Sequence, residues 1–294
     1  MAIPIAVAAG ALAASQAFIS GELAKTTDSF WAGLISNIGA FLAVLFFLFS
    51  KTFRQTLTTF FQKLQNKEIP IWMLFGGAFG AIYVATSAYA VASLGAGLFT
   101  IGVVASANFT SLIMDRFGFG SLQRYRINII RLFSALLAII AVAVAVYNPD
   151  EKLLLFPLFI VALAGIAQIL QLAFNSKLAT ITSTKIATFI NFPVSILVGT
   201  IFLISFIILN NSIPDFPRTW WLYSGGLLGA SFVLIAAWLV RILGVLVFTL
   251  ATISGQLVSA LFLDYLFLGI DLGWQIFSGA FLVLLAAYFA RGVR

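Results

Sequence analysis

Ten continuously apolar stretches follow one another along the chain, and short polar linkers separate them. A helix needs ~20 apolar residues to cross the ~30 Å hydrocarbon core of a bilayer, and each stretch approaches that length. Barrel strands are instead ~10 residues of alternating polarity, so these continuous runs favour helices. The pattern predicts an all-α integral membrane protein with ten transmembrane helices. The expected spans are Ala2–Ser20, Phe30–Phe49, Ile71–Leu94, Leu98–Met114, Ile129–Tyr147, Leu153–Phe174, Ile186–Leu209, Trp220–Val240, Leu243–Leu263 and Leu272–Phe289.

The ten stretches fall into two sets of five that repeat the same small motifs. Gly10 and Gln16 open the first set, and Gly165 and Gln171 open the second, at an offset of 155 residues. The offset of 155 continues through Leu23/Leu178, Ala32/Ala187 and Ile35/Ile190, and an offset of 149 then gives Gly76/Gly225, Gly77/Gly226, Gly80/Gly229, Gly95/Gly244, Phe99/Phe248, Thr100/Thr249 and Asp115/Asp264. The sequence therefore predicts a first five-helix repeat over residues 1–148 and a second over residues 149–294.

An odd number of spans in each repeat forces the two halves to enter the membrane from opposite sides. Inverted repeats of this kind are typical of secondary transporters. Cytoplasmic loops carry an excess of Lys and Arg, and a cytoplasmic N-terminus leaves only Lys25, Lys152 and Arg218 outside. The other thirteen basic residues then lie on the cytoplasmic side: Lys51, Arg54, Lys63, Lys67, Arg116, Arg124, Arg126, Arg131, Lys177, Lys185, Arg241, Arg291 and Arg294. We therefore expect both termini in the cytoplasm.

The composition argues against a soluble protein and against most enzymes. The chain is 62% hydrophobic and 9% charged, whereas a globular domain is about half apolar and a quarter charged. It has no cysteine and no histidine, which removes thiolate and imidazole ligands and the commonest general base. It also has no Walker loop, dinucleotide fingerprint, zinc motif or serine elbow. We therefore expect no enzyme activity, no catalytic residue, no cofactor and no metal. The net charge of +7 is assigned to membrane orientation rather than to nucleic acid.

Two glycine pairs lie at the spacing that lets membrane helices approach closely. Gly76 with Gly80, and Gly225 with Gly229, form GxxxG patterns in the third and eighth expected spans. Helix packing is the plain interpretation of these four residues. A compatible functional interpretation is that the smooth faces slide when the two halves rock.

Amide side chains within the apolar spans are the sharpest candidates for a binding site. An unpaired amide in hydrocarbon is costly, so each needs an interior partner, water or substrate. Asn191 also precedes Phe192 and Pro193, and Pro193 is expected to kink its helix beside a cavity wall. An interhelical hydrogen bond is the alternative role for each amide. Two deep aromatic residues are further candidates, with core packing as their alternative. The candidate substrate-binding residues are Gln16, Asn108, Gln171, Asn175, Asn191, Gln256, Tyr83 and Trp238.

Ionisable residues mark function in membranes because their burial is expensive. No expected span carries one near its centre. Glu22 lies one and a half turns beyond Gln16 and is the candidate for proton or cation coupling, although a plain position at a wet helix end is the alternative. Asp115 and Asp264 close the fourth and ninth expected spans and are interpreted as interfacial anchors.

The repeated motifs resemble those of the drug/metabolite transporter (DMT) superfamily, and within it the YdcZ-like branch. The second half matches the opening motif G-x5-Q-x3-N at Gly165, Gln171 and Asn175, and the first half matches it at Gly10 and Gln16, with Ser20 in place of Asn. Both halves contain the motif GG-x2-G, at Gly76, Gly77 and Gly80 and at Gly225, Gly226 and Gly229. The second half matches the closing GQ…D at Gly255, Gln256 and Asp264, and the first half keeps only Asp115. The resemblance implies a tandem fusion of two five-helix units that exports its substrate. It also implies peripheral fifth and tenth spans that support a homodimer.

Together the pattern and the resemblance predict a secondary transporter in a bacterial inner membrane. The expected function is export of a small polar or amino-acid-like solute by alternating access, with the site between the two halves and membrane lipid around them. An importer of a small organic cation or amine is the first alternative. A membrane-embedded enzyme or a scramblase-like protein is the alternative from a different class. The sequence leaves the substrate, the coupling ion and the oligomeric state open.

Overall fold

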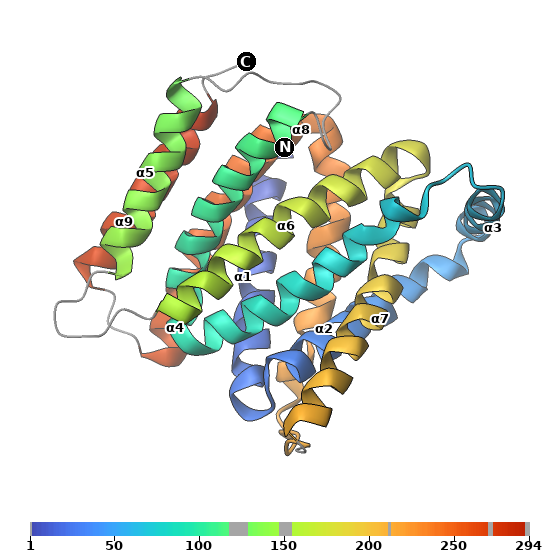
Figure 1. Ribbon diagram of the computed structural model, residues 1–294, viewed down its shortest axis with the longest axis horizontal. Helices are drawn as coiled ribbons and strands as arrows, with labels where there is room; N and C mark the ends of the chain where they lie inside the picture. Colours follow the sequence, from blue (N-terminus) through green and yellow to red (C-terminus); the bar gives the residue numbers. More distant parts are fainter. Residues whose placement is uncertain (1, 118–128, 147–154, 211–212, 270–272, 292–294) are drawn as a thin grey trace.

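The computed structural model describes residues 2–117, 129–146, 155–210, 213–269 and 273–291, which are predominantly helical and include no strand (Figure 1). The all-α prediction is therefore confirmed. The elements are α1 (Ala2–Thr26), α2 (Ser29–Val44), η1 (Leu45–Phe49), α3 (Lys51–Gln65), η2 (Ile71–Leu74), α4 (Phe75–Phe117), α5 (Ile129–Val146), α6 (Leu155–Ile181), α7 (Thr184–Asn210), η3 (Trp220–Tyr223), α8 (Gly225–Leu263), η4 (Asp264–Leu268) and α9 (Trp274–Arg291).

Polar residues in the short linkers start several helices. Asp28 begins α2, because its Oδ1 accepts hydrogen bonds from the backbone N–H groups of Phe30 and Trp31 at 2.7 and 3.0 Å. Ser183 lies just before α7, and its Oγ accepts from Ile186 N at 3.2 Å. Such side chains satisfy backbone donors that have no partner within the helix. The linkers can therefore be short, and consecutive helices form tight hairpins.

The third and fourth expected spans lie almost entirely within α4, and three residues separate them. The first of these, Gly95, interrupts the helical backbone with φ 81° and ψ 165°. Only glycine adopts this conformation without a steric penalty from Cβ. Figure 1 shows α4 turning sharply and continuing in a new direction. The eighth and ninth expected spans likewise lie within one element, α8.

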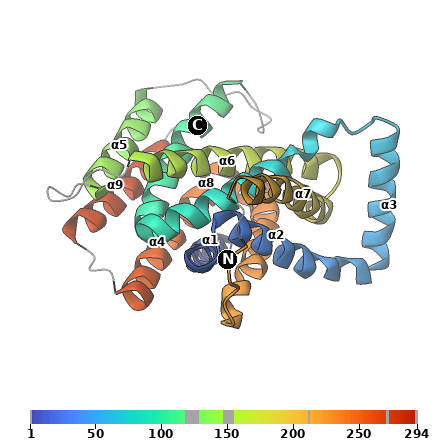
Figure 2. The same cartoon turned by 60° about the horizontal axis from the view of Figure 1, so that its bottom comes forward.

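The expected linker Ser50 to Pro70 contains an amphipathic helix, α3. Its buried side chains Phe53 and Phe60 belong to the apolar cluster between α2, α3 and α7, and the Phe53 ring lies 5.3 Å from that of Phe189. Most of its other residues are exposed. Figure 2 shows α3 beside the bundle rather than within it.

Helices of the first half pack mainly against helices of the second half. The principal contacts join α1 to α8, α4 to α6, α2 to α7 and α5 to α9. A Cβ on Gly10 of α1 would lie 2.9 Å from Gln256 N of α8, and one on Gly165 of α6 would lie 2.6 Å from Val103 O of α4. These two glycines are the positions paired by the sequence offset of 155. Both permit backbone-to-backbone contact at a helix crossing.

Apolar side chains cover the outside of the molecule. Exposed Leu197, Ile201 and Ile204 lie along α7, and exposed Phe277 and Phe281 lie along α9. So much exposed apolar surface requires an apolar surrounding. Among the described residues, five segments are long and apolar enough to cross a membrane: Ala2–Thr26, Ser29–Phe49, Ile71–Thr110, Leu155–Ile181 and Thr184–Asn210. Shorter apolar helices are Leu132–Ala145, Trp220–Ala236, Ala251–Phe267 and Trp274–Ala286.

Some of the predictions fall on residues outside the described part of the chain. These are the repeat boundary at residues 148 and 149, the basic residues Arg124, Arg126, Lys152 and Arg294, and the side chains of Asp115, Arg116, Arg131, Arg241 and Arg291.

Candidate functional site

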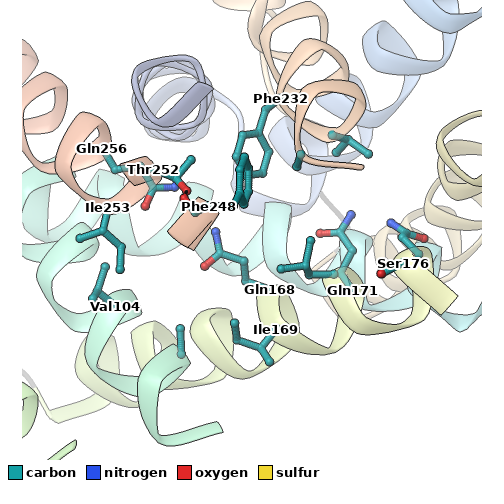
Figure 3. Close-up of a pocket in the computed structure, with 15 residues that line it drawn as sticks. Val104, Gln168, Ile169, Gln171, Ser176, Phe232, Phe248, Thr252, Ile253 and Gln256 are labelled. Carbon is teal, nitrogen blue, oxygen red and sulfur yellow. Dashed lines mark hydrogen bonds between the residues drawn. The ribbon is translucent and has the colours of Figure 1, made fainter. Parts of the chain in front are cut away.

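One face of α6 carries the polar residues of the site. Gln168, Gln171 and Asn175 lie at i, i+3 and i+7, so they share a face of the helix. This face is directed toward α8, and Figure 3 shows the Gln168 and Gln171 amides projecting from α6 into the intervening space. Between Leu155 and Phe174 the helix is otherwise apolar, so the amides there must be satisfied inside the protein.

This space is a pocket bounded by α4, α6 and α8. Its empty volume is about 820 Å³, which includes the open mouth. Phe232 and Phe248 of α8 form an aromatic wall, with ring centroids 6.5 Å apart. Opposite the α6 amides lie Thr252 and Gln256 (Figure 3). The pocket thus combines neutral polar groups with aromatic rings, as small-molecule sites commonly do. We call it the large pocket.

A buried amide on α7 holds two of the α6 amides in place. Asn191 Oδ1 accepts hydrogen bonds from Asn175 Nδ2 at 2.8 Å and from Gln171 Nε2 at 3.3 Å. Asn191 is 2% exposed and lies behind the pocket rather than on its surface. Its own Nδ2 has no hydrogen-bond acceptor among the described residues, which is costly for a buried donor. Asn191 is therefore a positioning residue in the structure.

Pro193 does not end the helix that carries Asn191, and α7 continues through it to Asn210. Two residues farther along, the Ser195 hydroxyl donates to Gly77 O at 2.6 Å. This bond ties α7 to α4 beside Gly80, which also lies next to the Gln171 amide.

The paired glycines make room for the amides. A Cβ on Gly80 would lie 2.6 Å from Gln171 Nε2, and a Cβ on Gly76 would overlap the Asn175 amide. In the other half, a Cβ on Gly229 would lie 2.8 Å from Gln16 Oε1. The glycines therefore do more than bring helices together, because they also leave space for a polar side chain from the neighbouring helix.

Gly225 has the corresponding position in the second half. A Cβ there would lie 3.3 Å from Ser20 Oγ. Ser20 occupies the position in the first half that Asn175 occupies in the second half. The shorter side chain leaves more room above Gly225 than Asn175 leaves above Gly76.

A second, smaller pocket lies between α1 and α4 and meets the large pocket at Gln256. Its empty volume is about 230 Å³, and Tyr83, Phe99 and Thr100 are among its lining residues. Gln256 is 8% exposed and lines both pockets. It therefore lies at the boundary between the two spaces.

The structure brings only part of the candidate set together at the large pocket. Gln171, Asn175 and Gln256 line it, Asn191 supports it, and Tyr83 lines the small pocket instead. The remaining candidates lie elsewhere. Gln16 is buried against Gly229, Asn108 is half-buried on α4, and Trp238 is 49% exposed on the outside of α8.

Glu22 lies near the end of α1 and pairs with a neighbour on the same helix. Lys25 Nζ donates to its Oε1 at 2.6 Å. Glu22 is not one of the residues that line either pocket.

Asp264 is not an interfacial anchor, and that interpretation was wrong. Its side chain is 3% exposed. Its Oδ1 accepts from Ala96 N at 2.9 Å and its Oδ2 from Gly97 N at 2.6 Å. It therefore caps the second part of α4 immediately after the Gly95 break, where the helix leaves backbone donors without partners.

Several lining residues were not among the sequence candidates. Gln168, Ser176, Phe232, Phe248 and Thr252 line the large pocket. Gln168 carried a usable signal, since it is an amide one turn before Gln171 on the same helix face. Phe248 carried only the repeat offset that pairs it with Phe99. Phe232 carried no signal, because the sequence contains 31 phenylalanines, and most of them meet lipid or the core.

The fold and the pocket define the class of the protein: a helical membrane protein with an uncharged polar pocket among its described helices. A family model narrows this class. The chain belongs to the family described as "Putative inner membrane exporter, YdcZ", whose model matches residues 1–144 and 156–289. The resemblance inferred from the motifs is therefore confirmed. The protein is a multi-pass protein of the inner membrane in a family of transporters.

Comparison with solved structures supports the fold alone. One, described only as "Crystal structure of protein", shares 13% identity and a TM-score of 0.55, over 97% of this chain and 96% of that chain. No curated protein matches the sequence.

Proposed function

We propose that the protein is a secondary active transporter that exports a small polar or amino-acid-like solute by alternating access between two inverted five-helix repeats. The observation that carries the proposal is that the two pockets are lined by residues paired through the sequence offsets of the repeat. The pairs, large pocket first, are Gln168/Ala13, Ile169/Ala14, Leu172/Ala17, Phe232/Tyr83, Phe248/Phe99 and Thr252/Val103.

Pockets related in this way are what an inverted repeat needs for alternating access. If the two halves exchange conformations, the small pocket takes the shape of the large pocket and the large pocket takes the shape of the small one. In this proposal the larger space, of about 820 Å³, belongs to the open pathway, and the smaller, of about 230 Å³, to the closed pathway. Gln256, which lines both, would meet the substrate in either state.

The orientation inferred from the basic residues directs the large pocket toward the cytoplasm. In that orientation α6 ends in the cytoplasm, and Asn175 and Ser176 lie in its second half. The small pocket is lined by Ala17, which lies in the outer half of α1. A pathway open to the cytoplasm is the state in which an exporter loads its substrate, which supports the direction implied by the family.

The lining favours a substrate without net charge. The described residues of the large pocket offer amide and hydroxyl groups, and none of them is charged. A net charge in such a site would have no counter-ion, which is expensive within a membrane. A neutral or zwitterionic solute with a small apolar part would match both the amides and the aromatic wall.

Transport by the purified protein tests the proposal. Proteoliposomes loaded with candidate solutes should release them in a gradient-dependent, saturable manner, and a strain that lacks the protein should accumulate the true substrate. Lipid movement without solute transport would support a scramblase instead, and gradient-driven uptake by cells would support the importer.

A further inference from the structure

Asp264 links two distant parts of the chain at the break in α4. Its carboxylate, from the end of α8, accepts both N–H groups of Ala96 and Gly97, which are 168 and 167 residues away in the sequence. A Cβ on Gly97 would lie 3.1 Å from Asp264 Oδ2, so glycine is needed for this close approach. The bond joins the proposed first and second repeats directly.

This link lies beside the small pocket. Phe99 and Thr100, which line that pocket, are within one turn of Gly97. Thr100 also donates from its hydroxyl to Ala96 O at 2.7 Å. The carboxylate therefore holds the start of the helix that forms one wall of the small pocket.

The carboxylate is nearly enclosed, and its charged neighbours come from α1. Lys25 and Glu22 interact electrostatically with Asp264, Lys25 in favour of its charge and Glu22 against it. The nearest groups from α4 are the two backbone amides, and the side chains of Leu261 and Ile276 beside Gly97 are apolar. Little solvent is available to stabilise the charge, so the two backbone hydrogen bonds are its main support.

We propose that Asp264 is a proton-operated latch: its carboxylate keeps the small pocket closed, and proton binding releases the start of the second part of α4 and opens that pocket. The inference rests on the proposed alternating access and makes the proton the ligand that controls opening of the small pocket. It assigns to Asp264 the proton-binding role that the sequence suggested for Glu22.

The release follows from the chemistry of the carboxyl group. The ionised group is an acceptor at both oxygens, whereas the neutral acid carries an O–H donor at one of them. That oxygen then faces a backbone N–H donor and loses its hydrogen bond. The proton comes from the water that reaches the site and returns to water when the latch closes. The latch is therefore intact above the pKa of Asp264 and released as the pH falls through it.

A single introduced thiol measures the state of the small pocket without any transport assay. The chain contains no cysteine, and Val103, which is 3% exposed, lines the small pocket. The Val103→Cys variant is placed in lipid nanodiscs, which leave both faces of the protein accessible, and is treated with a polar maleimide at pH values from about 5 to about 8. The rate of reaction of the thiol is measured at each pH and corrected for the fraction of thiolate. We expect the corrected rate to rise about tenfold toward low pH, the equivalent of one charge-assisted hydrogen bond.

Three second-site variants identify the residue that causes the pH dependence of the thiol reaction. Asp264→Asn in the Val103→Cys background should react at the fast rate at every pH, because the amide cannot ionise. Asp28→Asn is the matched control, since Asp28 also caps a helix with its carboxylate, but that helix, α2, contributes no lining residue to either pocket. This variant should keep the pH dependence. Glu22→Gln should also keep it.

The outcomes separate the latch from the transport proposal. A pH-independent rate in Val103→Cys alone overturns the latch, and this result needs no folded Asp264 variant. Loss of the pH dependence in Glu22→Gln assigns the proton to Glu22 and also overturns it. A pH-dependent rate that disappears only in Asp264→Asn supports the latch, even if proteoliposomes show no solute transport and the proposed function fails.

Discussion

The substitution Gly80→Ala tests whether the glycines of α4 exist to make room for the pocket amides. The added Cβ would lie 2.6 Å from Gln171 Nε2 and 2.9 Å from Ser195 Oγ. Both are closer than side chains normally approach, so Gln171 must move away from Asn191 or α4 must shift. Overpacking of this kind costs about 1–3 kcal/mol, while the helix gains about 0.5–1 kcal/mol from replacing glycine by alanine. We therefore expect a net loss of about 0–2.5 kcal/mol in stability.

Gly80→Ala should also lower transport. Displacing Gln171 removes its 3.3 Å hydrogen bond to Asn191 and moves a lining amide of the large pocket. Loss of one neutral hydrogen bond to substrate corresponds to about 0.5–1.5 kcal/mol, or about two- to tenfold in apparent affinity. The assays are thermal unfolding in detergent and solute transport in proteoliposomes, at matched protein amounts.

Gly199→Ala is the matched control on α7. Its Cβ would meet only Leu34 Cδ1, at 3.6 Å, an ordinary contact. This variant should be as stable as the parent protein or slightly more so, with unchanged transport. If Gly80→Ala behaves like Gly199→Ala in both assays, the glycine does not position the amide and the reasoning fails.

Three further predictions test other parts of the account. Gln171→Leu and Gln256→Leu should each lower transport at normal expression by about two- to tenfold; unstable protein would make these amides structural, and parental transport would remove them from the site. Gly255→Ala should lower the unfolding temperature clearly, because its Cβ would overlap the backbone carbonyl of Val7, and an unchanged temperature would show that α1 and α8 can move apart freely. Reporter tags at the two termini should both report the cytoplasm, whereas tags on opposite sides would refute an even number of spans.

The sequence predicts the helical segments well because membrane burial imposes a length and a composition that are visible along the chain. It also identifies Gln171, Asn175 and Gln256, since an amide in an apolar helix is conspicuous. It fails for Trp238, which is exposed on the outside of α8. An almost wholly apolar helix has no polar face to reveal which side meets lipid, so the rotation of α8 about its axis is set only by packing.

Contacts between the two halves are the second feature that could not be predicted from the sequence. Asp264 closes an expected span, which is where an anchor would also lie, and its partners Ala96 and Gly97 are backbone groups without a sequence signature. The sequence places the break between Leu94 and Leu98, but it does not identify Gly95 as the residue that makes it, because only its φ of 81° distinguishes Gly95 from the packing glycines around it. The aromatic wall of Phe232 and Phe248 is hidden among many similar residues.

Access to the two pockets from the two sides of the membrane tests the central claim most directly. Thr252→Cys and Val103→Cys place one thiol each at positions paired by the repeat, in the large and the small pocket, in a chain without other cysteines. In sealed vesicles, an impermeant thiol reagent should reach Thr252→Cys only from the cytoplasmic side and Val103→Cys only from the opposite side. Conditions that increase one reactivity should decrease the other. Labelling of both variants from the same side, or a simultaneous rise of both, would contradict alternating access between inverted repeats.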